Sequence, residues 1–125
     1  MRLLDFQYIG DGWDLKPIQF QPVNLIVGKN AVGKSRLIKG LSNAAQHISQ
    51  ATDNKNETSF GATFVFSSGT ERVFYHFSYI NGKVALEKLF IEKNPEHLES
   101  LLERNAEGTL LHGEAISPPE DKLVF

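Results

Sequence analysis

The chain has 125 residues and a mass of 14.0 kDa, which suits one domain with a hydrophobic core of its own. Hydrophobic residues make up 41% and charged residues 22%, as is typical of a soluble globular protein. Cysteine is absent, which excludes disulfides, a thiol nucleophile and thiolate-bound metal sites. The formal net charge of -2 gives no support for polyanion binding over the whole surface, although a local basic patch stays open.

The sequence carries no targeting or membrane-spanning signal. Its first ten residues lack the apolar stretch of a secretory signal, and no apolar run approaches the roughly 20 residues that span a bilayer. We therefore expect a cytoplasmic protein with no membrane partner.

Alternating apolar and polar residues predict two strands at the start of the chain. Residues 4–8 alternate, residues 10–12 form a turn, and residues 13–20 return as a second strand. Pro17 would place this second strand at a sheet edge or a bulge, because proline donates no hydrogen bond to a neighbouring strand.

A buried strand and a helix are expected next. Residues 23–27 form a nearly continuous apolar run, as in a strand that is covered on both faces. From Lys34 onwards the apolar residues recur at helical spacing, and the helix fades before Thr52. Its apolar stripe consists of Leu37, Leu41, Ala44, Ala45 and Ile48. The polar residues 52–59 predict a surface loop.

Residues 60–92 predict a three-stranded antiparallel meander with turns at Ser68-Gly69 and Asn81-Gly82. A two-residue loop at Asn81-Gly82 would set the register of the second hairpin and gather aromatic residues on one face. The expected cross-strand pairs are Tyr79 with Val84, Phe77 with Leu86, and Val73 with Phe90.

A second helix is predicted from Asn94-Pro95-Glu96, which combine a capping residue, a proline at the first helical position and an acid in the first turn. Gly108 would end this helix. Its apolar face would hold Leu98, Leu101 and Leu102, and its solvated face Glu96, Glu99 and Glu103. Leu123–Phe125 look like the beginning of a further strand, so we expect the chain to be part of a longer protein.

The motif that carries chemistry is GxxxxGKS over Gly28–Ser35, which is the P-loop pattern. It stands between the predicted buried strand and the predicted helix, which is the context that a P-loop needs. The candidate nucleotide-binding residues are Gly28, Lys29, Asn30, Ala31, Val32, Gly33, Lys34, Ser35 and Arg36. Within this set we expect Lys29 to face solvent and Asn30 to brace the loop.

The residue types of the motif suit a triphosphate. Glycines let the backbone curl so that successive N–H groups converge on phosphate oxygens, and the start of the helix adds the positive end of its dipole. Lys34 is the candidate catalytic residue, because its ammonium group would reach the β- and γ-phosphates. Ser35 would give its hydroxyl to Mg²⁺. The predicted ligands are a nucleoside triphosphate and Mg²⁺.

Residues 2–41 resemble the start of ABC-type ATPase heads of the soluble branch, the SMC-like, RecF-like and OLD-like P-loop ATPases of the AAA family. The resemblance rests on Leu4-Asp5-Phe6, on Val23–Val27, and on Gly28-Lys29-Asn30 together with Gly33-Lys34-Ser35. The chain departs from the family at Ala31, where glycine is usual. The resemblance implies an α/β fold, a partial P-loop NTPase: the N-terminal lobe of an ABC-type head, with a mixed sheet, a P-loop helix and an antiparallel meander in one domain over residues 1–125.

The resemblance also implies a function. ATP would join two heads in a head-to-head homodimer and its hydrolysis would release them, in DNA repair or defence, with DNA as a partner by family analogy alone. The sequence has no apolar strand ending in Asp-Glu and no LSGGQ-like segment, which the family uses for hydrolysis. We therefore expect a C-terminal ATPase lobe outside these residues, and ATP binding with little turnover by this chain alone.

Two other functions stay open. A small nucleotide or metabolite kinase would usually need several lid arginines, whereas the four arginines of this chain are not clustered. A non-catalytic interaction domain with an empty P-loop is the other alternative, and the intact Lys34 and Ser35 argue against it.

A few aromatic residues and histidines are further candidates for ligand contacts. Tyr8 or Trp13 could stack on an adenine, although core or edge packing is the simpler interpretation. No two histidines have metal-ligand spacing, so surface or cross-strand roles are expected for His47, His76, His97 and His112.

Overall fold

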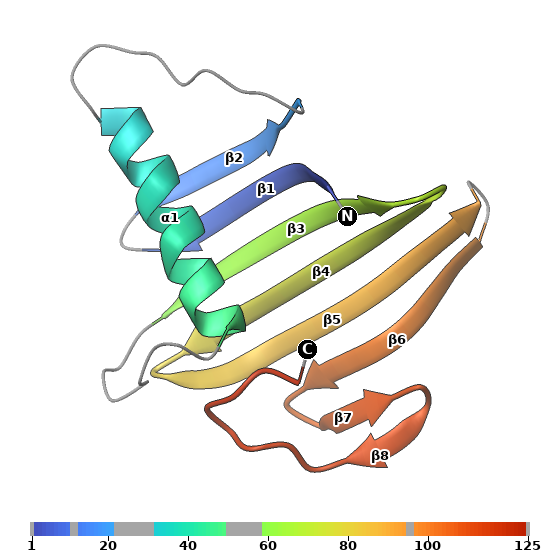
Figure 1. The fold of residues 1–125 in the computed structure, drawn as a ribbon. Helices are drawn as coiled ribbons and strands as arrows, with labels where there is room; N and C mark the ends of the chain where they lie inside the picture. The colour runs from blue at the N-terminus through green and yellow to red at the C-terminus, as the bar shows by residue number, and fades with distance from the viewer. Residues whose placement is uncertain (1, 11–12, 22–31, 50–58, 95–96, 125) are drawn as a thin grey trace.

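A computed structural model describes residues 2–10, 13–21, 32–49, 59–94 and 97–124 (Figure 1). The described elements are one helix, α1 (Val32–Ile48), and eight strands: β1 (Arg2–Gly10), β2 (Trp13–Gln19), β3 (Phe60–Ser68), β4 (Glu71–Ile80), β5 (Lys83–Asn94), β6 (His97–Asn105), β7 (Gly108–Leu111) and β8 (Glu114–Ile116). In the described ranges no helix has both the length and the apolarity that crossing a bilayer requires.

The eight strands form one sheet in the order β2-β1-β3-β4-β5-β6-β7-β8, and every neighbouring pair of described strands is antiparallel. The expected α/β P-loop NTPase fold with a mixed sheet is therefore wrong. In the chain α1 stands between β2 and β3, and both of these strands pair antiparallel with β1, which lies between them in the sheet. The other described connections are short reversals, which join antiparallel strands. The predicted strand at residues 23–27 lies outside the described residues, and so does the predicted loop at residues 52–59 except for Ser59, which is exposed and in no strand.

An aromatic core lies between the sheet and α1, which crosses one face of β1, β3 and β4 (Figure 1). The inward side chains are buried at alternate positions of each strand, which confirms the predicted alternation: Phe6 and Tyr8 on β1, Phe60, Ala62 and Phe64 on β3, and Val73, Tyr75, Phe77 and Tyr79 on β4. From α1, Leu37 and Ala44 are buried in this core, and Leu41 and Ile48 pack against it. Ala45 is exposed, so its place in the predicted stripe is wrong.

The meander over β3, β4 and β5 is confirmed, and so is the tight turn between β4 and β5. Asn81 and Gly82 have φ angles of 51° and 76°, the left-handed conformation that a two-residue hairpin turn requires. Tyr79 pairs with Val84 as predicted. A register shift between Ser78 and Tyr79 then changes the two remaining pairs.

The register shift between β4 and β5 is a β-bulge, and it changes which side chains of β5 face the core. Phe77 pairs with Glu87 instead of Leu86, and Val73 pairs with Ile91 instead of Phe90. An extra residue in one strand of a hairpin moves every later side chain of that strand to the other face. The bulge therefore directs the carboxylate of Glu87 into the core, where it is 0% exposed.

The predicted helix after Asn94 is wrong, because residues 97–105 form β6 and pair with β5. Leu98 is 63% exposed, whereas Leu102 and Arg104 point inward at strand spacing. Pairing with the open edge of β5 overrides the local helix signals, which are weak compared with tertiary hydrogen bonds and packing. The predicted solvated helix face also disappears: Glu99 lies on β6, where its Oε2 lies 2.8 Å from Nζ of Lys93, and Glu103 is exposed on the same strand.

Pro17 lies on β2, which is an edge of the described sheet, as predicted. At the other end of the chain, residues 117–124 form no strand, so the predicted strand at Leu123–Phe125 is wrong for its described residues. They return over β5 and β6 on the face of the sheet that buries Glu87, beside the area that α1 covers (Figure 1).

Candidate functional site

The structure places the second half of the P-loop motif at the start of α1. Val32, Gly33, Lys34, Ser35 and Arg36 occupy its first turns, and their side chains lie outside the described part of the chain. The remaining candidates, Gly28, Lys29, Asn30 and Ala31, lie wholly outside it. The first turn of α1 contains no acidic residue, so no carboxylate of that turn competes with an anion for the unpaired N–H groups of the helix start.

A close contact at Gly40 and a hydrogen bond from Asn43 join the body of α1 to β1. A Cβ added at Gly40 would lie 3.2 Å from Cγ of Tyr8, so glycine permits this close approach. Nδ2 of Asn43 donates a hydrogen bond of 2.9 Å to the hydroxyl of Tyr8. Tyr8 is 1% exposed, so it packs in the core and offers no ring face to an adenine. The side chain of Trp13 lies outside the described residues.

His47 fixes the last turn of α1. Its ring lies 4.7 Å from that of Phe60 and 4.9 Å from that of Tyr79, measured between centroids, and the residue is 5% exposed. Its Nδ1 lies 2.9 Å from the carbonyl oxygen of Asn43 and donates to it, since a carbonyl only accepts. Nε2 has no partner among the described residues. His47 is therefore a packing residue of the core and does not resemble a surface histidine.

The other histidines are spread over the sheet. His76 lies on β4, where its Nδ1 is 2.8 Å from the hydroxyl of Thr63, and burial lowers the pKa of its imidazole with a further contribution from the charge of Lys88. His97 and His112 are exposed. Among the residues that the structure describes, no three His, Cys, Asp or Glu side chains are grouped to hold a metal ion. The predicted Mg²⁺ would therefore depend on Ser35 and on the phosphates.

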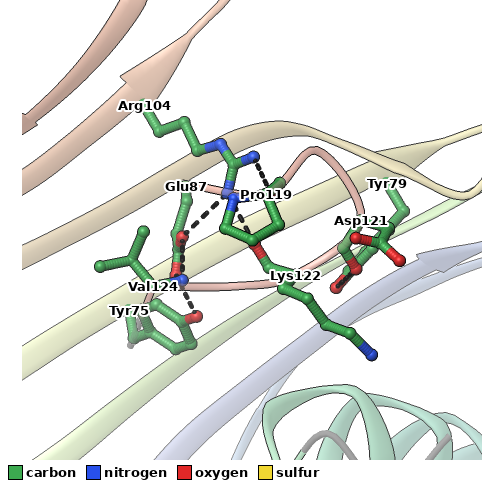
Figure 2. A network of polar contacts seen from close by, with 8 residues as sticks. All are labelled: Tyr75, Tyr79, Glu87, Arg104, Pro119, Asp121, Lys122 and Val124. Carbon is green, nitrogen blue, oxygen red and sulfur yellow. Dashed lines mark hydrogen bonds and ion pairs between the residues drawn. The ribbon is translucent and has the colours of Figure 1, made fainter. Parts of the chain in front are cut away.

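A second constellation of polar side chains lies under residues 117–124 (Figure 2). Glu87 accepts a hydrogen bond of 2.7 Å from the hydroxyl of Tyr75 and one of 2.9 Å from the main-chain N–H of Val124. Nη1 of Arg104 lies 3.9 Å from Oε1 of Glu87. Arg104 donates from Nη1 to the carbonyl of Lys122 and from Nη2 to the carbonyl of Pro119, each over 2.7 Å.

Burial makes this network electrostatically strong. Tyr75 and Glu87 are 0% exposed and Arg104 is 6% exposed. Burial, followed by the charge of Glu87 and the hydrogen bond to it, raises the pKa of the Tyr75 hydroxyl, which therefore stays protonated and donates. Burial removes the hydration of the Glu87 carboxylate and the Arg104 guanidinium. The attraction between these opposite charges and their hydrogen bonds offset this loss.

The sequence patterns do not predict this network, for two reasons. The predicted register directs Leu86 inward and Glu87 outward, and the local pattern around Arg104 predicts a helix. One signal was present: Glu87, Leu89 and Ile91 follow one another at strand spacing, so a charge occupies a position of an otherwise apolar face. A charge at such a position usually has a buried partner.

No protein-family model, curated protein or solved structure matches this chain.

Proposed function

We propose that the chain binds a nucleoside triphosphate, ATP foremost, together with Mg²⁺ through Gly28–Ser35. The observation that carries this proposal is that α1 begins at Val32, inside the GxxxxGKS motif and two residues before Lys34. A P-loop works only where a helix starts at this point of the motif, because the unpaired N–H groups of its first turn face the phosphates.

The chemistry of the proposed site is local to the motif. Main-chain N–H groups, one ammonium group and one hydroxyl group provide the contacts to the phosphates and to Mg²⁺, and all of them come from one short stretch of chain. The antiparallel sheet removes the expected family fold as support, but it changes none of these groups. The sheet fixes the position of α1 through contacts with Gly40, Asn43 and His47.

Thermal unfolding with Mg-ATP tests the proposal. A ligand that binds only the folded state stabilises it by about 2.7 kcal/mol at about 100 times its Kd. Lys34→Ala removes the proposed phosphate cation without weakening the helix, because alanine is the best helix former. Lys39→Ala is the matched control, since Lys39 is an exposed lysine of the same helix.

We expect Mg-ATP to raise the unfolding temperature of the wild type and of Lys39→Ala, and to leave that of Lys34→Ala nearly unchanged. Inorganic tripolyphosphate should compete with ATP and adenosine should not, because the contacts are to phosphates. Equal responses of wild type and Lys34→Ala, or no response of either, would refute the proposal. Phosphate release should stay at the background rate in all three proteins, because the sequence lacks the family's Asp-Glu strand for water activation.

A further inference from the structure

The polar network under the C-terminal residues recognises main-chain atoms. We call residues 117–124 the strap, and Tyr75, Glu87 and Arg104 the clamp. Glu87 accepts from the N–H of Val124, and the two Nη groups of Arg104 donate to the carbonyls of Lys122 and Pro119 (Figure 2). These contacts engage no side chain of the strap.

The guanidinium of Arg104 fits a turn within the strap. The N–H of Lys122 points to the carbonyl of Pro119 over 3.4 Å, so that residues 119–122 form a turn whose two end carbonyls face the same side. The planar fork of an arginine matches two oxygens in this arrangement, and both distances are 2.7 Å. The clamp therefore selects a turn and, through Glu87, the N–H two residues after it.

Two other hydrogen bonds of the strap also involve its main-chain carbonyls. The N–H of Val84 donates to the carbonyl of Glu120 over 2.7 Å, and the hydroxyl of Tyr79 to the carbonyl of Asp121 over 3.4 Å. Leu123 is 3% exposed and belongs to the core, which makes it the one deeply buried side chain of the strap. The strap is thus held through the main chain of a turn and through two apolar side chains, Leu123 in the core and Val124 packed against it.

We propose that the clamp is a peptide-binding site for a proline-led turn followed by an apolar residue, and that the strap of a second copy of this chain can replace the chain's own strap. The strap leaves β8 through Ser117-Pro118-Pro119, and prolines donate no ladder hydrogen bonds, so it is not an extension of the sheet. A segment that lies outside the hydrogen-bonded ladders of the sheet can open while the sheet stays folded, at a lower free energy than the whole domain. The intramolecular strap has the advantage of a high effective concentration, on the order of millimolar for a short tether.

The direct test weakens the chain's own strap and supplies another. Leu123→Asp in the full chain removes the apolar anchor and leaves the clamp intact. The probe is a fluorescein-labelled peptide of residues 117–124, and its anisotropy reports binding. We expect the peptide to bind the Leu123→Asp chain and to bind the wild type more weakly. Adding Glu87→Gln to Leu123→Asp should weaken binding by at least about tenfold, because it replaces the charged acceptor of the hydrogen bond from Val124 with a neutral one.

Two altered peptides distinguish recognition of the main chain from non-specific binding. Methylation of the peptide nitrogen of Val124 removes the donor to Glu87, and aspartate in place of Leu123 removes the anchor. Both should lose binding by at least about tenfold. If the Leu123→Asp chain has the circular dichroism of the wild type and does not bind the unmodified peptide, or binds the methylated peptide equally well, the proposal is wrong.

If Leu123→Asp fails to fold, hydrogen exchange of the wild-type chain tests whether the strap opens while the sheet stays folded. The amide of Val124 should exchange at least about tenfold faster than the protected amides of β4, because the strap opens while the sheet stays folded. Glu120→Gln, which removes an exposed ion pair of 3.1 Å with Lys83, should leave this ratio unchanged. Exchange of Val124 at the rate of the β4 amides would show that the strap opens only when the domain unfolds, and would overturn the proposal.

Discussion

Glu87→Gln removes the buried negative charge of the clamp and should lower the stability of the fold. Glutamine has nearly the shape of glutamate, so no cavity forms and the change is one of charge and hydrogen bonding. Only one of its two terminal atoms accepts a hydrogen bond, whereas both carboxylate oxygens of Glu87 lie within 3.2 Å of the N–H of Val124. The amide nitrogen would then face either the N–H of Val124 and the guanidinium of Arg104, or the hydroxyl of Tyr75.

The magnitude follows from the contacts. Hydrogen bonds to a charged group contribute about 1.5–3 kcal/mol and neutral ones about 0.5–1.5 kcal/mol, so the bonds from Tyr75 and Val124 should weaken by about 1 kcal/mol each. Arg104 loses the negative charge at 3.9 Å but keeps two carbonyl acceptors. Removing one partner of a buried pair costs about 3–5 kcal/mol in general, so the longer distance here favours a total of about 3 kcal/mol.

Urea unfolding followed by far-ultraviolet circular dichroism measures this loss at neutral pH. We expect the free energy of unfolding to fall by about 3 kcal/mol, and the unfolding temperature to fall by about 10 °C. Glu120→Gln is the control: its ion pair with Lys83 is exposed, with side chains 77% and 68% accessible, and should leave stability unchanged. A loss below about 1 kcal/mol in Glu87→Gln would show that the buried carboxylate adds little beyond a neutral acceptor.

Two further predictions concern Gly40 on α1 and His76 on β4. Gly40→Ala should lower the free energy of unfolding by about 1 kcal/mol in urea, because the contact at 3.2 Å with the buried ring of Tyr8 outweighs the helix preference of alanine; a gain in stability would mean that the ring yields. Burial lowers the pKa of His76 in the folded chain below the usual value of 6.5. Below that pH the unfolded chain binds more protons than the folded chain, so the free energy of unfolding decreases as the pH decreases. Between about pH 7 and about pH 5 the wild type should therefore lose more stability than His76→Gln, and equal losses would contradict this assignment.

The strands with strict alternation could be predicted without the structure. Burial alternates over residues 6–8 of β1, 60–64 of β3 and 73–79 of β4, and Asn81-Gly82 turns the chain with the left-handed φ angles that its residues favour. These features depend on neighbours in sequence. The predicted start of the helix near Lys34 is confirmed for the same reason, since α1 begins at Val32.

The errors arose where distant residues decide. Asn94-Pro95-Glu96 carry good helix-start chemistry, yet the following segment became β6 because β5 offers it a free edge. A single bulge after Ser78 exchanged the faces of Leu86 and Glu87. No local pattern contains these facts, because a register and an edge are properties of two strands together.

The sequence by itself determined where the chain alternates, where it turns, and that a glycine-rich motif precedes a helix. The tertiary structure alone decided that the described strands form one antiparallel sheet, that Glu87 and Arg104 meet in its core, and that they hold the main chain of residues 117–124. The physical reason is range: backbone preferences and side-chain periodicity act over a few residues, whereas strand pairing and charge burial gain their energy from residues that the fold must first bring together.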